Sequence, residues 1–266
     1  MLNVNNKFKW ANIIAFTAMV AVNILADVIP IGGYTTAEVS KIYPNLFTPA
    51  PFTFAIWGVI YILLAGFAFL YQTGVIDHNP RFTERISGWF ILSCAMNIGW
   101  LLSWHFDAIG LSVLFMLGLL ISIIAMNERT DDIKPSLFES LVVKLPLGLY
   151  FGWITVATIA NISVWFVSIG VSLPAAAEQI VTVIIMLIGT GIAGIVLTLK
   201  EDPFYGIAVA WGYAGIIVRH IVGGGYPVIV AAAIVSVLIV LSLTVSPLFG
   251  GHKREPSESS KNAQTT

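Results

Sequence analysis

The sequence predicts an all-α integral membrane protein, and its composition and its charge balance both support this fold class. The chain has 266 residues, of which 58% are hydrophobic and 10% are charged, whereas soluble domains carry about 25% charged residues. So little polar surface cannot cover a water-soluble globule of this size. The net charge of −1 gives nucleic acid nothing to bind. The lipid bilayer is therefore the expected partner, and nucleic acid is not.

Long uncharged runs locate the membrane spans, because about 20 apolar residues cross a hydrocarbon core of roughly 30 Å. Trimming these runs at their Pro and Gly residues predicts eight helices. They are expected at residues 11–29, 53–72, 86–105, 109–127, 142–166, 177–199, 204–221 and 227–247. The first could instead be a signal peptide that follows Lys7 and Lys9, but no small-residue cleavage site comes after it.

The basic residues predict the orientation of these spans, because Lys and Arg near span ends stay on the cytoplasmic side. If the N-terminus is inside, the inner segments hold Lys7, Lys9, Arg81, Arg85, Arg129, Lys134, Lys200, Lys253, Arg254 and Lys261. The outer segments hold Lys41 and Arg219, and Lys144 can extend back to the inner face from the start of the fifth span. A multi-pass protein of the cell membrane with both termini cytoplasmic is expected.

The longest polar loop, residues 28–52, separates the first two spans. A loop of this length is usually functional. It is expected to lie on the outer face as a lid over the mouth of the bundle, because part of it is apolar and can pack downward. The apolar residues are Tyr34, Ile42, Tyr43, Leu46 and Phe47.

Aromatic and amide side chains recur at helical spacing in three spans. They are Trp57 and Tyr61 in the second span, Asn97 and Trp100 in the third, and Tyr150, Trp153, Ala157 and Asn161 in the fifth. Buried amides are costly in hydrocarbon and need partners. Large π surfaces, a small residue beside them and a few polar groups predict a pocket for a flat apolar ligand. A single Trp is typical of the aromatic belt at the membrane interface or of a helix contact. The same pattern in three helices favours the pocket.

Small residues four apart distinguish the sixth and seventh spans. They are Gly189 and Ala193, then Gly206, Ala210 and Ala214, and they let helix backbones approach closely. Gly189-Thr-Gly191-Ile-Ala-Gly194 matches a dinucleotide fingerprint, but that motif requires a preceding strand. Helix packing is the expected role of these residues.

Catalytic and metal-binding patterns are not visible in the sequence. The four histidines include no pair at metal-ligand spacing. His105 and Asp107 suit a polar turn better than a proton relay, and Arg219 and His220 end the seventh span on the outer side, with an anion site as the alternative. The chain is expected not to be an enzyme and to hold no metal and no resident cofactor.

Three segments carry a resemblance to a known family. Pro49, followed eight residues later by Trp57 and then by Tyr61, matches the family's second helix. Asn97-Ile-Gly-Trp100, Trp104 and Gly110-Leu111 match its third and fourth helices, and the spacing of Tyr150, Trp153, Ala157 and Asn161 matches the fifth. Pro51 stands where a second Trp is usual, and Leu149 where a Pro is usual. The chain resembles the tryptophan-rich sensory proteins that include the mitochondrial translocator protein (TspO/MBR).

The resemblance implies a domain organisation. Residues 1–10 would be a cytoplasmic N-terminus and residues 11–170 a five-helix TspO-like core that includes the outer loop. Residues 171–249 would form a three-helix transmembrane extension, as in longer bacterial members, and residues 250–266 a cytoplasmic tail. The composition of that tail, rich in Ser, Lys and Glu, predicts disorder.

The resemblance also implies a function. Members of the family bind tetrapyrroles such as protoporphyrin and haem, and serve as proposed sensors or transporters. Trp57 and Trp153 would then stack on both faces of the ligand or lie at its edge, and Asn97 would hydrogen bond to its polar rim. Ala157 would leave room for the ligand, and Asn161 would fix the packing of the helices. Tyr61, Trp100, Tyr150 and Pro49 complete the predicted site, and a homodimer is a candidate assembly. The alternative is a secondary transporter of a small hydrophobic solute that uses the three extra helices, but neither internal repeats nor a midplane ionisable site is visible.

Overall fold

The computed structural model describes residues 8–71 and 79–249, and all of its regular elements in these ranges are helical. The α-helices are α1 (Lys9–Val28), α2 (Thr36–Ile42), α3 (Ile56–Ala65), α4 (Pro80–His105), α5 (Ile109–Glu128), α6 (Leu137–Glu139), α7 (Leu145–Ser168), α8 (Ala175–Lys200), α9 (Pro203–Val222) and α10 (Pro227–Phe249). Short 3-10 or π-helical segments are η1 (Ile31–Gly33), η2 (Pro51–Ala55), η3 (Gly66–Tyr71) and η4 (Ser140–Lys144). The predicted tail, residues 250–266, lies outside the described residues.

The eight predicted spans are confirmed: eight helices in the described ranges are long and apolar enough to cross a membrane. The third and fifth begin earlier than expected, at Pro80 and Leu137. Asn79 caps α4 by accepting a hydrogen bond from the Arg81 amide at 3.1 Å, and Ser136 forms a capping box with Glu139 before α6. These caps satisfy exposed backbone donors and so extend both helices into polar sequence.

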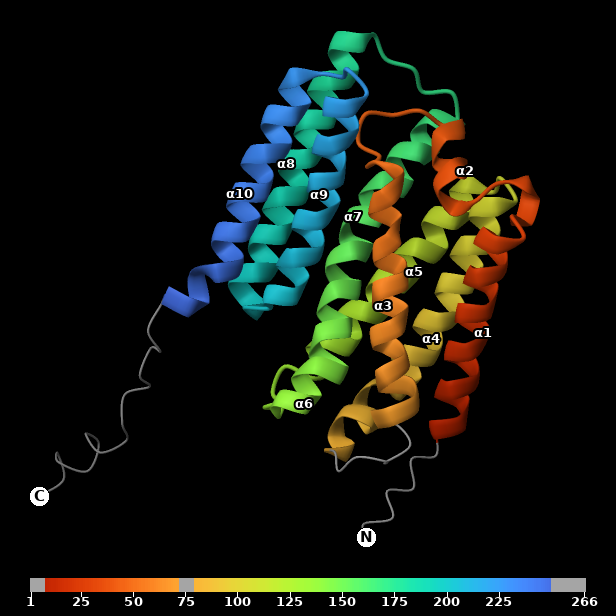
Figure 1. Ribbon diagram of the computed structural model, residues 1–266, viewed down its shortest axis with the longest axis vertical. Coiled ribbons are helices and arrows are strands. Elements are labelled where there is room, and N and C mark those ends of the chain that lie inside the picture. Colours follow the sequence, from red (N-terminus) through yellow and green to blue (C-terminus); the bar gives the residue numbers. More distant parts are fainter. Residues whose placement is uncertain (1–7, 72–78, 250–266) are drawn as a thin grey trace, which may run out of the picture.

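The helices divide into two neighbouring groups, which Figure 1 shows side by side. Helices α1, α3, α4, α5 and α7 form one group, and α8, α9 and α10 form the other, with α9 packed along α7. Gly152 of α7 faces Tyr205 and Ala208 of α9, and Gly212 of α9 faces Val156 of α7. A Cβ atom at either glycine would collide with the opposite helix, so these residues set the close approach of the two groups.

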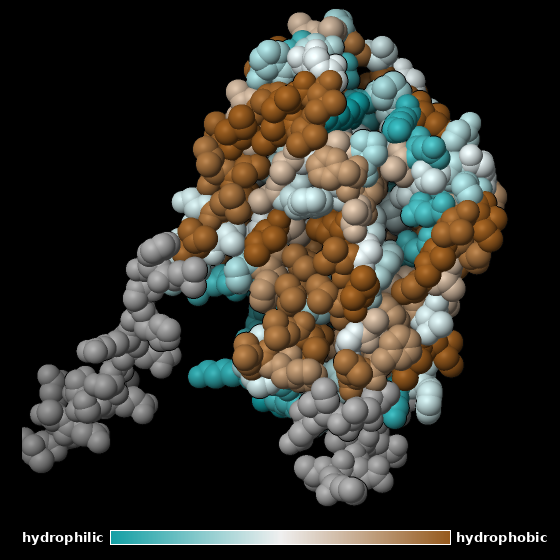
Figure 2. All heavy atoms as spheres, in the orientation of Figure 1, coloured by the Kyte–Doolittle hydropathy of each residue, from teal (hydrophilic) through white to brown (hydrophobic). Residues whose placement is uncertain are grey.

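The small residues predicted in the sixth and seventh spans do lie in helix contacts. A Cβ atom on Gly206 would meet Thr244 of α10, and one on Gly189 would meet Tyr213 of α9. Outward-facing positions on α8 and α10 carry exposed apolar side chains such as Ile184, Leu187 and Leu238, and Figure 2 shows hydrophobic surface along the flank of the bundle. This division is expected where lipid surrounds the helices.

Residues 29–50, called here the cap segment, contain η1 and α2 and cross one end of the bundle (Figure 1). Val39 of the cap packs with Trp104, Ile109 and Val164 in a small apolar cluster of its own. The predicted long loop is therefore a packed covering of the bundle, with part of its chain helical. We call this end of the bundle the cap end.

Charged side chains gather at the opposite end. Lys200 at the end of α8 pairs with Glu128 at 2.6 Å and with Asp131, which connects the second group of helices to the first. Arg81 and Arg85 pair with Asp132. The hydrogen bond from Arg85 lowers the pKa of the Asp132 carboxyl. Burial raises the pKa of Asp202, which caps α9 by accepting from the Phe204 amide at 2.9 Å.

Candidate functional site

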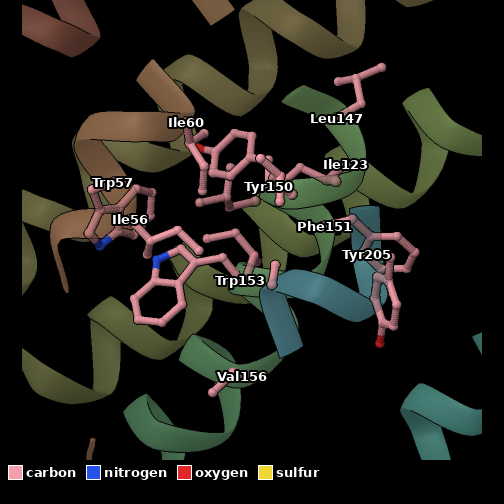
Figure 3. Close-up of a cluster of buried hydrophobic side chains, with 14 of the residues drawn as sticks. Ile56, Trp57, Ile60, Ile123, Leu147, Tyr150, Phe151, Trp153, Val156 and Tyr205 are labelled. Carbon is pink, nitrogen blue, oxygen red and sulfur yellow. The ribbon is translucent and has the colours of Figure 1, made fainter. Parts of the chain in front are cut away.

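The tryptophans of α3, α4 and α7 meet in one aromatic cluster near the cap end. Trp57 stacks on Trp100, with ring centroids 5.3 Å apart and planes 26° apart. Trp153 meets Trp57 nearly at right angles, at 6.1 Å and 88°, and Figure 3 shows these two rings next to each other. The rings fill the space between the helices, so no slot for a flat ligand lies between Trp57 and Trp153.

A hydrogen-bond network lies beside this cluster. The Asn97 amide donates to the hydroxyls of Tyr61 at 3.1 Å and Tyr150 at 3.2 Å. Its oxygen accepts from the Asn23 amide at 2.8 Å, and Tyr61 donates to the Asn23 oxygen at 2.9 Å. Four helices are thereby joined through side chains, which satisfies the buried amide of Asn97.

Asn161 holds three helices together on the other side of the tryptophans. Its oxygen accepts from Trp100 Nε1 at 2.9 Å, and its amide donates to Ser112 Oγ at 2.9 Å. It is 3% exposed. Asn161 therefore joins α7 to α4 and α5 and fixes the plane of the Trp100 ring.

An open cleft of about 470 Å³ runs between α1, α3 and the cap segment. Its aromatic wall is made by Trp57, Tyr61 and Trp100. Its polar lining comes from Asn23, Asp27, Thr35 and Thr36. A hollow of about 30 Å³ behind the same tryptophans, lined in part by Trp153, Ala157 and Asn161, holds little more than a water molecule.

The structure thus distributes the predicted site residues over three places. Trp57, Tyr61 and Trp100 line the cleft, with Asn97 and Tyr150 in the network behind them. Trp153, Ala157 and Asn161 line the small hollow, and the buried Trp153 Nε1 has no hydrogen-bond partner among the described residues. Pro49 lies apart from both, against Gly215 of α9.

The cap segment is attached to the end of α4 where it borders the cleft. Trp104 Nε1 donates to the Thr36 carbonyl at 3.1 Å, and His105 Nε2 is hydrogen bonded to the Thr36 hydroxyl at 3.1 Å. His105 Nδ1 donates to the Ile31 carbonyl at 2.8 Å. The Thr36 amide donates to Asp27 of α1 at 3.0 Å. His105 is therefore a structural anchor for the cap.

Helix α9 attaches the other half of the cap segment and the first turn of the second span. Arg219 donates to the Thr48 carbonyl at 2.5 Å, and His220 Nε2 to the Leu46 carbonyl at 2.9 Å. The Gly215 carbonyl accepts from the Ala50 amide at 3.1 Å. Trp211 Nε1 donates to the Thr53 carbonyl at 2.9 Å. The three-helix group thus holds the chain that leads into Trp57.

Sequence reasoning missed Asn23 and Asp27 of α1 and the roles of Trp211, Arg219 and His220. Asn23 and Asp27 are four residues apart in a mainly apolar span, and such spacing puts two polar groups on one helix face. That signal could have placed α1 at the site. The α9 residues gave no comparable signal, because they bond to backbone carbonyls more than 150 positions earlier in the chain. Among the described residues, no group of three His, Cys, Asp or Glu side chains could hold a metal ion.

The family model for TSPO-like protein matches residues 9–246. The match covers all five helices of the first group and also α8, α9 and most of α10. No curated protein and no solved structure matches the chain. Eight apolar helices and a match over nearly the whole length establish that this chain belongs to the family of TSPO-like membrane proteins.

Proposed function

We propose that this protein binds a flat hydrophobic ligand in the cleft between α1, α3 and the cap segment, and acts by binding rather than by chemical conversion. The observation that carries the proposal is the wall of Trp57, Tyr61 and Trp100 facing an open space of about 470 Å³. Ligand sites of this kind range from about 300 to 1,000 Å³ and pair apolar walls with a few polar groups. Tetrapyrroles, the ligand class expected from the family resemblance, suit such a wall.

The polar groups of the cleft limit how a tetrapyrrole can lie in it. The donors of Asn23 and Thr35 are already used within the protein, by the Met19 carbonyl and the Asn97 oxygen and by the Glu38 carboxylate, and the Asp27 carboxylate repels a propionate. The propionate edge of protoporphyrin or haem must then point toward the open mouth. No histidine lines this cleft within the described residues, so haem would be held by its ring face without an axial histidine.

The test is a titration of detergent-solubilised protein with protoporphyrin, followed by the absorbance of the porphyrin itself so that Trp variants can be compared. Stacking on an aromatic side chain contributes roughly 1 to 3 kcal/mol. Trp57→Ala should therefore weaken binding about fivefold to over a hundredfold, and Trp57→Phe should weaken it much less.

Trp89 provides the matched control. It is half-buried at the end opposite the cap, under the guanidinium of Arg129 at 5.3 Å, and Trp89→Ala should leave the affinity unchanged. Asp27→Asn should tighten protoporphyrin binding by removing the repulsion. Equal affinities for Trp57→Ala, Trp89→Ala and the unchanged protein would contradict the assignment of the cleft.

A sensor and a transporter both bind the ligand, but only a transporter moves it across the membrane. Protoporphyrin uptake into proteoliposomes should appear if the protein is a transporter and should be lost in Trp57→Ala. Binding without flux favours a sensor. A homodimer remains a further proposal, for which light scattering of the purified protein is the measurement.

We also propose that the cap segment faces outward and that both termini are cytoplasmic. The asymmetry of Lys and Arg between alternating loops supports this orientation. Reporter fusions after Lys134 and Lys261 should read cytoplasmic, and a fusion after Leu173 should read external. An external reading at Lys261 would contradict it.

A further inference from the structure

A second hollow, of about 520 Å³, lies between the cap segment, α7 and α8, away from the aromatic cleft. Its walls are mostly apolar and include Leu46, Phe47, Phe166, Val167, Val181 and Ile185, with polar groups from Asn45, Ser163, Ser172 and Thr182. We call it the α8 groove. Phe166 is 45% exposed and Val181 is 39% exposed, so the groove opens on the side of the bundle that faces lipid.

The cap wall of this groove is firmly held. Phe47 is buried and meets the edge of the Tyr213 ring of α9 at 6.5 Å and 83°. His220 holds the neighbouring Leu46 carbonyl. A groove with a fixed wall is preformed, and a ligand that enters it loses little free energy to rearrangement of the protein.

One carboxylate, that of Glu178, lines the groove. Glu178, Thr182 and Ile185 recur at intervals of four and three, so they share one face of α8. The Glu178 carboxylate makes no direct ion pair and accepts no hydrogen bond within the described residues, although its charge acts from a longer distance on the guanidinium of Arg219. Arg219 of α9 donates instead to the Thr48 carbonyl. The first turn of a helix favours a carboxylate, but that interaction leaves its oxygens free to accept from another donor.

The polar and apolar parts of the groove are arranged along the membrane normal. Glu178 lies in the first turn of α8, and α8 is long enough to span a bilayer, so we expect this turn at the level of the head groups. Ile185 lies seven residues further, which is about 10 Å deeper into the bilayer at 1.5 Å per residue. The groove thus has a hydrogen-bond acceptor at the level of the lipid head groups and an apolar channel below it. This arrangement is complementary to a molecule with a cationic, hydrogen-bond-donating head and a hydrocarbon chain.

We propose that the α8 groove binds a bilayer phospholipid with a primary-amine head group. Its ammonium donates to the Glu178 carboxylate, and one acyl chain lies between α7 and α8. The bound lipid contacts Leu46 and Phe47, which belong to the same cap segment that supplies Thr35 and Thr36 to the aromatic cleft. The proposal does not depend on the ligand of that cleft.

The test uses the full chain in phosphatidylcholine nanodiscs that contain a small fraction of phosphatidylethanolamine with a photoreactive acyl chain. Crosslinks mapped by mass spectrometry should concentrate in residues 163–185. Val181→Trp fills the groove and should reduce them at least fivefold. Ile180→Trp, at a neighbouring position that is 61% exposed, should leave them unchanged. Crosslinks spread evenly over α8 and α10, and insensitive to Val181→Trp, would overturn the proposal.

The head group is tested by repeating the experiment with a phosphatidylglycerol probe that carries the same photoreactive chain. The unchanged protein should crosslink the ethanolamine probe at least threefold more strongly than the glycerol probe. Glu178→Gln should abolish that preference, with thermal melting to verify that the variant is folded. A preference that survives in Glu178→Gln would overturn the assignment of the amine to this carboxylate.

Discussion

The two groups of helices use buried polar side chains in different ways. In the first group, amides reach across helices, as Asn97 does to Tyr61 and Tyr150. In the second group the buried polar links are hydroxyls. Thr182 and Thr244 bond the carbonyl four residues earlier in their own helix, and Thr190 is hydrogen bonded both to the Met186 carbonyl of its own helix and to Ser236 Oγ of α10 at 2.9 Å.

This difference has a physical consequence in lipid, where apolar contact alone does not favour one helix pairing over another. Cross-helix amides specify partners and orientations, so the first group is built to hold an aromatic wall in place. The second group packs through small residues and attaches to the first at Gly152, at Lys200 and along the cap. We conclude that the first group forms the cleft and that the second supports the segment that covers it.

Disrupting the contact between the two groups of helices should lower the stability of the protein more than any other change described below. Gly152→Val places a side chain against the backbone carbonyl of Tyr205, and overpacking of this kind costs about 3 kcal/mol. The melting temperature in detergent should fall clearly. Gly191→Ala is the control, because nothing lies within 4 Å of its Cβ position and Ala favours a helix. Equal melting of Gly152→Val and the unchanged protein would mean that α7 and α9 do not pack as described.

The next largest loss of stability is expected when a cross-helix amide is removed, compared with the removal of a hydroxyl. Asn161→Ala leaves Trp100 Nε1 and Ser112 Oγ without this partner and should cost about 2 kcal/mol of unfolding free energy. Thr182→Val in the second group should cost about 0.6 kcal/mol, because membrane hydrogen bonds of ordinary kind contribute that much and the Thr182 hydroxyl bonds the Glu178 carbonyl of its own helix. Denaturation by graded SDS measures both. A larger loss for Thr182→Val than for Asn161→Ala would reverse the comparison.

Support of the cap by α9 should be visible in hydrogen exchange. Arg219→Gln weakens a charged hydrogen bond to Thr48, worth about 1.5 kcal/mol or more. The backbone amides of residues 45–48 and of Ala50 should then exchange about tenfold faster by mass spectrometry, with little change in overall melting. Lys41→Gln, an exposed cation in the same cap, serves as the control. Unchanged exchange in Arg219→Gln would show that α9 does not hold the cap.

The smallest effect concerns the contact of Tyr43 with Asp107 at the edge of the cap. The hydrogen bond to the Asp107 carboxylate raises the pKa of Tyr43 to about 12, above its usual value of about 10. Because the folded pKa is raised, the contribution of this contact is complete below about pH 10 and is lost as the pH rises through about 12. The difference in melting temperature between the unchanged protein and Tyr43→Phe should shrink over that range. Tyr34→Phe, at an exposed cap position, should show no such dependence.

Much of the architecture could be predicted because it depends on properties local to the chain. Uncharged length determines where a span can cross a bilayer, and the eight spans were predicted on that basis. Spacing by four residues places Trp57 with Tyr61, and Trp153 with Asn161, on single helix faces. The residue types of the aromatic cluster were visible for the same reason.

The tertiary structure alone decided which faces meet. Periodicity defines a helix face but not the neighbour it is turned toward, so the pairing of Asn23 with Asn97, 74 positions away, could not be predicted. The same holds for the right-angle contact that closes the space between Trp57 and Trp153 and moves the cleft to the α1 side. It also holds for Arg219 and the Thr48 carbonyl, 171 positions apart, because a backbone acceptor has no sequence signature.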